Sequence, residues 1–211
     1  MEKLVCRDIK EIFARLNRMA AEKKQYLIEL DGVMGDGDLG LTMAAVFKAA
    51  DTFAADFTDE DAGALFMKTG MVMAKAAPST MGTLMATGFM RGGKALKGLT
   101  EVDTQAAGKF WRAFTDGIME RGKAKPGEKT IIDALNPASQ ALEKAADMGE
   151  SLTSALQKAS DAAQTGLEST KGMMAQHGRA AYYQEKSKDV LDPGATIGAY
   201  VVKVFADYVQ D

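Results

Sequence analysis

The segment ATIGAYVVKVFADYVQ, residues 195–210, carries the clearest helical pattern in the chain. Its large apolar residues recur after four, seven, eight and eleven positions, which places them on one face of an α-helix: Ile197, Val201, Val204, Phe205 and Tyr208. A half-buried strand would instead alternate apolar and polar residues. The segment therefore predicts an amphipathic helix.

The rest of the chain indicates helices as well. Valine and isoleucine are scarce, whereas alanine, methionine, lysine and glutamate are abundant, which is typical of helices rather than strands. Apolar residues recur at spacings of three to four, and Gly- or Pro-containing breaks separate the repeats. We predict an all-α bundle with helices near residues 3–20, 23–31, 40–56, 60–77, 80–96, 103–122, 129–147, 151–176 and 195–210. The second of these either is short or merges with the first.

Length and composition limit the classes of function. A chain of 211 residues without a long linker fits one domain, residues 1–211. The net charge of −3 argues against nucleic acid or an anionic membrane as the partner, because both require a basic surface. No run approaches the roughly 18 apolar residues that span a bilayer, and the N-terminus lacks a signal-peptide core. The single cysteine, Cys6, excludes internal disulfides and cysteine-based metal sites, so we expect a cytoplasmic protein.

A glycine-rich acidic stretch, LDGVMGDGDLG at residues 30–40, is the first candidate site. It places Asp31, Asp36 and Asp38 within eight residues, and the stretch contains four glycines. Carboxylates this close repel one another unless a cation lies between them, and oxygen ligands suit Mg²⁺, Mn²⁺ or Ca²⁺. A helix is predicted to begin near residue 40, and its free N–H groups favour an anion such as a phosphate. The stretch therefore predicts a metal–nucleotide site.

Two other interpretations of the acidic stretch were weighed. An EF-hand loop needs oxygen ligands at positions 1, 3 and 5 and a glutamate at position 12. Neither register fits, because position 12 falls on Thr42 when the loop starts at Asp31 and on Phe47 when it starts at Asp36. A solvated turn remains open from these residues alone, since Asp and Gly are common in turns.

Three stretches together resemble a known family. They are LDGVMGDGDLGLTM (30–43), RGKAKPGEKTIIDALNP (121–137) and GRAAYYQEKSKDVLDPGAT (178–196). In the same order they resemble motifs of the L subunit, the ADP-binding subunit, of bacterial dihydroxyacetone kinases and of the equivalent domain in single-chain kinases. The resemblance covers nearly the whole chain. It implies an eight-helix antiparallel barrel that holds a nucleotide at one end.

The resemblance also implies roles for individual residues. Asp31, Asp36 and Asp38 would hold two Mg²⁺ ions that bridge the phosphates of ADP or ATP, and Arg179 would be the catalytic group near the transferring phosphate. An ordinary surface ion pair is the alternative for Arg179. Lys123 and Lys129 are expected to be structural or peripheral. The remaining contacts implied for the nucleotide are Leu39, Gly40, Leu41 and Thr42 at the phosphates, Thr80, Met81 and Gly82 on the opposite side, Gly122 and Ile131 at the adenine, and Asp192, Pro193 and Gly194 closing over it.

The chain departs from the family pattern at four positions, two of which are Glu128 in place of an aspartate and Lys186 in place of an arginine. Leu39 stands where the family usually has histidine, and Met81 where it has serine, although Ser79 or Thr80 can supply a hydroxyl group. The metal carboxylates are intact, so we expect nucleotide binding to persist, with the identity of the ketose substrate left open.

The resemblance further implies that this chain is one half of an enzyme. In the family the triose is bound to a histidine of a separate subunit or domain, and His177, the only histidine here, does not match it. We expect His177 to be a polar surface group. The implied partners are a substrate-binding (DhaK-like) kinase subunit and a phosphotransferase-system (DhaM-like) phosphoryl donor, with a homodimer left open. The alternative function is a nucleotide-binding regulatory module without catalysis.

Overall fold

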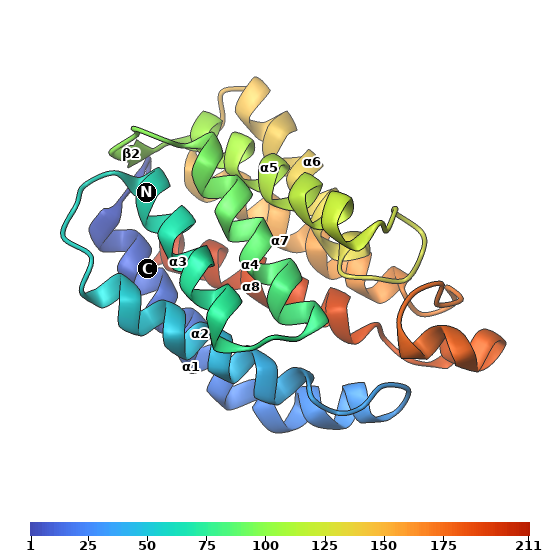
Figure 1. Ribbon diagram of the computed structural model, residues 1–211. Helices are drawn as coiled ribbons and strands as arrows, with labels where there is room; N and C mark the ends of the chain where they lie inside the picture. The colour runs from blue at the N-terminus through green and yellow to red at the C-terminus, as the bar shows by residue number, and fades with distance from the viewer.

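The protein is almost entirely helical (Figure 1). The computed structural model describes residues 1–211, and no helix has both the length and the apolar composition needed to cross a bilayer. The eight α-helices are α1 (Cys6–Gly32), α2 (Leu39–Ala55), α3 (Ala62–Ala76), α4 (Thr80–Ala95), α5 (Thr104–Gly122), α6 (Ile132–Asp147), α7 (Leu152–Ser169) and α8 (Pro193–Gln210). A 3₁₀ helix, η1 (Arg179–Asp189), precedes α8, and two short strands, β1 (Leu4–Val5) and β2 (Glu101–Val102), pair antiparallel.

The predicted all-α class is confirmed, with corrections to individual elements. The predicted helices at 3–20 and 23–31 form one helix, α1, because the residues between them, Ala20 to Glu22, are good helix formers. The helix predicted at 151–176 ends at Ser169, shortly before Gly172, which adopts φ +91°. No helix is predicted between residues 176 and 195, and this segment contains η1.

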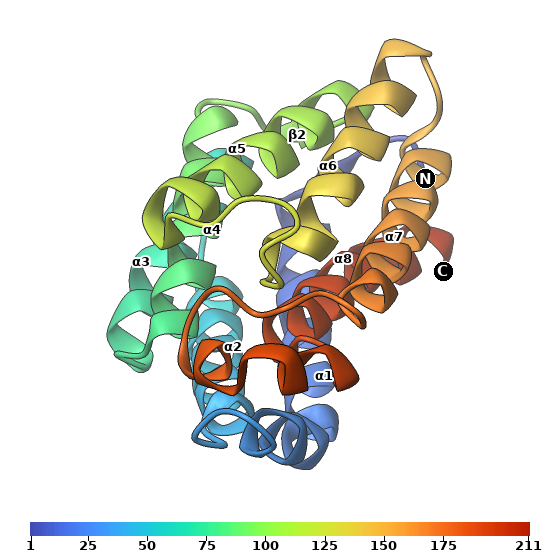
Figure 2. The same cartoon turned by 90° about the vertical axis from the view of Figure 1, so that its right-hand side faces the viewer.

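The helices form a closed ring. Each α-helix packs against the next one in the chain, and α8 packs against α1. Consecutive helices run in opposite directions, so α2, α4, α6 and α8 all begin at the same end of the barrel. Figure 2 views the molecule from this end, which also carries η1 and the α1–α2 loop. The ring confirms the expected eight-helix barrel.

Aromatic side chains fill the other end of the barrel. Neighbouring rings have centroids 4.4 to 6.3 Å apart and come from α1, α3, α4, α5 and α8. Each is at least 98% buried, and burial of this much aromatic surface is a large contribution to stability. The members of this aromatic cluster are Phe13, Phe66, Phe89, Phe110, Trp111, Phe114 and Phe205.

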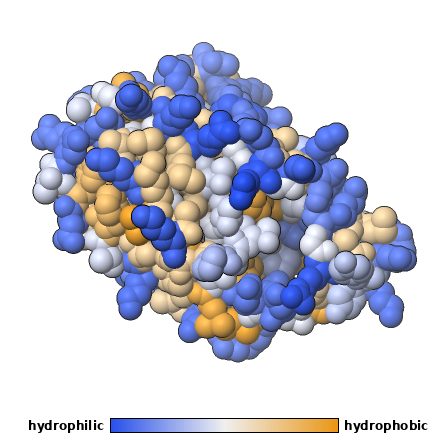
Figure 3. Space-filling model, in the orientation of Figure 1, coloured by the Kyte–Doolittle hydropathy of each residue, from blue (hydrophilic) through white to orange (hydrophobic).

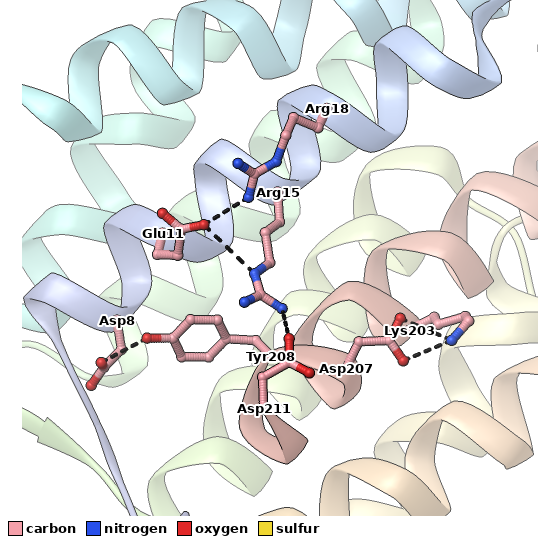
Figure 4. Close-up of polar contacts among 8 residues, drawn as sticks. All are labelled: Asp8, Glu11, Arg15, Arg18, Lys203, Asp207, Tyr208 and Asp211. Atoms are coloured by element: carbon pink, nitrogen blue, oxygen red, sulfur yellow. Dashed lines mark hydrogen bonds and ion pairs between the residues drawn. The ribbon is translucent and has the colours of Figure 1, made fainter.

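Polar contacts close the ring between α1 and α8 at this aromatic end (Figure 4). The hydroxyl of Tyr208 donates to Asp8 Oδ1 at 2.8 Å, and Asp8 Oδ2 accepts the N–H of Val5 at 2.8 Å. The guanidinium of Arg15 lies over the Tyr208 ring and pairs with Asp211 at 2.5 Å. Burial and the neighbouring carboxylate of Asp8 raise the pKa of Tyr208 to about 12, so the phenol remains a donor at every physiological pH.

Close backbone approach between α3 and α4 depends on glycine. A Cβ on Gly93 would lie 2.4 Å from the backbone nitrogen of Met67 and 2.6 Å from the carbonyl oxygen of Gly63. Backbone atoms cannot move aside as a flexible side chain can. The two helices therefore pack at this distance only because position 93 lacks a side chain.

We predict that Gly93→Ala destabilises the protein by about 1–3 kcal/mol through overpacking. The matched control is Gly108→Ala in the middle of α5, where the new Cβ would meet nothing closer than 3.7 Å. This control should be neutral or stabilising by about 0.5–1 kcal/mol, because alanine favours a helix interior. Urea unfolding of the two variants measures the difference, and equal free energies of unfolding would contradict the packing argument.

Candidate functional site

Two hollows of the molecule differ clearly in the chemistry of their lining. The larger is an open groove of about 990 Å³ on the outer face between α2 and α3, beside the apolar area visible in Figure 3. Its polar lining consists of two lysines, two aspartates and two threonines scattered around Phe53 and Phe57, without a converging set of ligands. The smaller is a cleft of about 310 Å³ at the end of the barrel where the even-numbered helices begin. The smaller cleft is the better candidate for the functional site, because most of the predicted site residues line it.

The starts of four helices line this cleft. Leu39 begins α2, Thr80 begins α4, Ile131 caps α6 and Pro193 begins α8, and all four are cleft residues. The first N–H groups of an α-helix have no partner within the helix, and the helix dipole adds partial positive charge there. The antiparallel ring thus directs four sets of partial positive charge at one cleft, which suits a polyanion.

The three predicted metal ligands converge on the same cleft. Asp31 lies in the last turn of α1, Asp36 in the loop that follows, and Asp38 at the N-cap of α2. One carboxylate oxygen from each lies within 4.8 Å of the others. Gly35 permits this arrangement, because a Cβ there would lie 2.3 Å from Asp31 Oδ1. Three oxygens at these separations fit a hard divalent cation, which binds oxygens at about 2.0–2.6 Å.

Burial and like charge both act on this acidic cluster. Burial raises the pKa of Asp38, and the negative charges of Asp36 and Asp31 raise it further. Arg179 opposes the shift, since its Nη2 lies 2.9 Å from Asp36 Oδ2. The fold thus brings Arg179, at the start of η1, to the acidic cluster as expected. Both residues of this ion pair line the cleft, and 67% of the Arg179 side chain and 44% of the Asp36 side chain are exposed, so a catalytic role for Arg179 stays a prediction.

The wall opposite the acidic cluster is the start of α4. The hydroxyl of Ser79 accepts the N–H of Gly82 at 3.0 Å and so caps the helix. Thr80 and Met81 line the cleft directly. A Cβ on Gly194 would lie 3.0 Å from Met81 Cε and 3.2 Å from the backbone nitrogen of Ile131, so these three predicted residues come together.

Asp192 is a buried acid at the start of α8. Its side chain accepts the N–H of Ala195 at 2.6 Å, and its own N–H donates to Thr170 Oγ1. Burial raises its pKa to about 7, although the Ala195 N–H and the charge of Lys129 act in the opposite direction. The cleft therefore contains a carboxyl group that is partly protonated near neutral pH.

Lys129 makes structural contacts, as expected, and Asp133 does so as well. Lys129 is buried, which lowers its pKa, and its Nζ donates to the carbonyl oxygens of Thr170 and Val190. Asp133 accepts the N–H groups of Gly127 at 2.5 Å and Thr130 at 2.7 Å. These contacts fix the loop between α5 and α6 that forms one wall of the cleft.

Five predicted nucleotide contacts do not line the cleft with their own atoms. Gly40 packs against the α1 backbone, and the side chain of Leu41 is 54% exposed on the outside. Gly122 lies behind Leu84, which does line the cleft. Thr42 and Gly82 are buried next to each other, one layer back from the cleft. Contacts from these five positions stay predictions: Gly40, Leu41, Thr42, Gly82 and Gly122.

His177 is a site residue that sequence reasoning missed. It was expected to be a polar surface group, but it lines the cleft, and its Nε2 lies 2.7 Å from Glu128 Oε2. The signals in the sequence were that it is the only histidine and that it directly precedes the motif beginning at Gly178. The apolar residues Met34, Leu84, Val190 and Leu191 also line the cleft without having been predicted.

Comparison with known proteins agrees with this geometry. A family model described as the DAK2 domain matches residues 33–207. The chain belongs to this family. It is 31% identical over 192 residues to the ADP-binding subunit DhaL of the PEP-dependent dihydroxyacetone kinase of Escherichia coli (strain K12), with 91% of each chain covered. It is 37% identical to the corresponding subunit of dihydroxyacetone kinase 1 of Listeria innocua, with 82% of each covered.

Larger kinases are similar over part of their length. The chain is 34% identical to the L-erythrulose 1-kinase of Mycolicibacterium smegmatis, covering 96% of this chain and 36% of that protein. The crystal structure of the dihydroxyacetone kinase of C. freundii in complex with AMP-PNP and Mg²⁺ superimposes with a TM-score of 0.70 at 27% identity, covering 94% of this chain and 33% of that one. The predicted enzyme class, a kinase of the glycerone kinase type, is confirmed by these relatives, which are named as kinases.

We predict that Asp192→Asn changes how stability depends on pH. The folded-state pKa of about 7 exceeds the ordinary aspartate pKa of 3.8, so the folded protein binds this proton more tightly than the unfolded chain does. The stability that Asp192 contributes is therefore full below pH 4 and is lost as the pH rises through 7. Asparagine still accepts the Ala195 N–H but does not titrate. Between pH 4 and pH 8, the stability difference should shift in favour of the variant by up to about 4 kcal/mol.

Urea unfolding of the nucleotide-free proteins across this pH range measures the shift. A stability difference between variant and wild type that stays constant with pH would contradict the assignment of a raised pKa to Asp192.

Proposed function

We propose that this chain is the nucleotide-binding subunit of a ketose kinase and that it holds Mg²⁺ with ADP or ATP in the cleft described above. The observation that carries the proposal is the convergence of three carboxylates and four helix starts on one cleft. Carboxylates alone suit many cations, and helix starts alone suit many anions. The two together suit a divalent cation that is already bound to phosphates.

The proposed roles follow the charges of the side chains. Asp31, Asp36 and Asp38 hold two Mg²⁺ ions, and bound Mg²⁺ neutralises charge on the phosphates. The starts of α2 and α4 donate N–H groups to phosphate oxygens, and the apolar side chains of Leu84 and Ile131 lie against the base. Arg179 contributes a positive charge next to the phosphate that moves. These roles fit phosphoryl transfer, in which a protein mainly positions groups and stabilises charge.

The phosphoryl acceptor is proposed to come from a partner. The relatives that this chain covers almost completely are named as ADP-binding subunits, whereas the single-chain kinases are about three times as long. We therefore propose a DhaK-like subunit that carries dihydroxyacetone or a related short ketose, and a phosphotransferase-system protein that rephosphorylates the nucleotide, all in the cytoplasm. A shallow hollow lined by Met34, Gly35, Arg179, Tyr182 and Tyr183 adjoins the cleft, and Tyr182 is 87% exposed. Exposed aromatic side chains beside a reactive group favour the docking of a partner protein there.

A regulatory module is the second candidate function. Leu39 and Met81 cannot donate the side-chain hydrogen bonds that histidine and serine provide at these positions in the family. A protein with this change can retain a nucleotide and report its phosphorylation state without transferring phosphate.

We predict that Asp36→Asn weakens binding of ADP in the presence of Mg²⁺. Loss of a group that merely supports a metal ligand costs about 10–100-fold in affinity, and loss of a ligand itself should cost at least as much. Asp207→Asn is the matched control, because Asp207 pairs with Lys203 on the surface at the opposite end of the barrel (Figure 4). Calorimetry measures both affinities. Unchanged binding in Asp36→Asn would contradict the proposed site.

Transfer of labelled phosphate separates the two candidate functions. The purified chain is mixed with Mg·ATP, its substrate-binding subunit and dihydroxyacetone or erythrulose. Labelled ketose phosphate that forms only when both proteins are present supports the kinase subunit. Tight nucleotide binding without transfer to any short ketose supports the regulatory module.

A further inference from the structure

The connection between α7 and α8 crosses the mouth of the cleft. We call residues 170–192 the strap (Figure 2). Within η1, which forms its outer part, only Ser187 is buried. Segments with few buried apolar side chains can open locally at low cost without unfolding of the whole protein. Polar contacts must therefore hold the strap in place.

These polar contacts fall into two groups. Lys129 ties the two ends of the strap together through the carbonyl oxygens of Thr170 and Val190. The middle of the strap, residues 173–189, has only two side-chain links to the rest of the barrel. One is the pair of Arg179 with Asp36, and the other is the pair of His177 with Glu128.

Glu128, the partner of His177, is also held in place by backbone contacts. Glu128 Oε2 also accepts the N–H of Lys125 at 2.7 Å, and the backbone carbonyl of Glu128 accepts the N–H of Gln176 at 3.3 Å. The hydrogen bond from His177, followed by that from Lys125, lowers the pKa of Glu128, which is therefore ionised. An ionised carboxylate only accepts hydrogen bonds, so Nε2 of His177 carries a hydrogen and donates it.

Arg179 lies two residues beyond this link. Between them, Gly178 adopts φ +64° and ψ −160°, a backbone conformation that favours glycine. The position of the guanidinium thus depends on where residue 177 is anchored. A cation bound to Asp36 would compete with Arg179 for its oxygens. His177 is then the one mid-strap side-chain link that is independent of the metal ligands, next to the longer backbone hydrogen bond of Gln176.

We propose that His177 is a positioning residue: by donating to Glu128 it holds the strap over the bound nucleotide, sets the position of Arg179, and slows nucleotide release. This inference rests on the proposed function in one respect, which is that the cleft binds a nucleotide. The link joins one side of the cleft mouth to the other, so its loss allows the middle of the strap to move away while the carboxylates and the helix starts stay in place.

The test measures the rate at which ADP leaves the Mg²⁺-loaded protein. We expect His177→Ala to raise this rate about fivefold, as suits one partly buried hydrogen bond to a charged group. His177→Gln keeps an N–H donor and should return the rate to within about twofold of wild type. Glu185→Ala is the matched control, because Glu185 pairs only with Lys188 inside the strap and does not tie it to the barrel.

A double-mutant cycle adds a readout that a general loss of structure would not produce. His177→Ala and Glu128→Ala should each raise the release rate. The double variant should release ADP no faster than Glu128→Ala alone, because that variant already removes the link to His177 along with the contact to Lys125. Unfolding temperatures close to wild type are expected for all of them. A release rate unaffected by His177→Ala, or additive effects in the double variant, would overturn the inference.

Tryptic cleavage of the nucleotide-free protein tests the strap without relying on the proposed function. The middle of the strap, residues 173–189, contains Arg179, Lys186 and Lys188 as cleavage sites. Cleavage there should be about fivefold faster in His177→Ala than in wild type or Glu185→Ala, since proteolysis reports the population of the open form. Unchanged cleavage contradicts the inference. Absence of any Mg·ADP binding contradicts the proposed function instead, so the two failures are distinguishable.

Discussion

The site depends on one electrostatic constraint: three carboxylates lie with oxygens within 4.8 Å of one another, and such a cluster needs positive charge. The ligand-free fold supplies only part of that charge. Arg179 contacts Asp36, and burial, followed by the negative charges of Asp36 and Asp31, still raises the pKa of Asp38. A divalent cation relieves the repulsion between the carboxylates. The partial positive charge at the helix starts then also has a role, because it faces the phosphates bound to that cation.

The barrel makes this arrangement a consequence of topology. An even number of antiparallel helices in a closed ring places the starts of α2, α4, α6 and α8 at one end. The aromatic cluster fills the opposite end, and the Asp8–Tyr208 and Arg15–Asp211 contacts close the ring there. The packing that stabilises the fold thus lies at one end of the barrel, and the groups that bind a ligand lie at the other end. The binding end can hold unfavourable charge and a loosely packed strap because the other end is tightly packed.

The sequence predicted the helices well because their apolar periodicity is local. It also predicted the acidic cluster, since Asp31, Asp36 and Asp38 lie within eight residues. Contacts between residues far apart in the sequence could not be predicted in the same way. Periodicity does not say which loops meet at the end of a barrel, so the approach of Arg179 to Asp36 came only from the family resemblance. The pairing of His177 with Glu128, 49 residues apart, was not predicted at all. The interruption of the strap by η1 was also missed, because its polar, Lys-rich sequence has no apolar stripe.

The central claim is tested most directly by a crystal of the protein grown with ADP and Mn²⁺, whose anomalous scattering locates the ion. The account predicts Mn²⁺ within about 2.0–2.3 Å of oxygens from Asp31, Asp36 and Asp38, and also bound to the diphosphate of ADP at the starts of α2 and α4. An anomalous map without a peak between these three carboxylates, with ADP absent from the cleft or bound elsewhere, would contradict it.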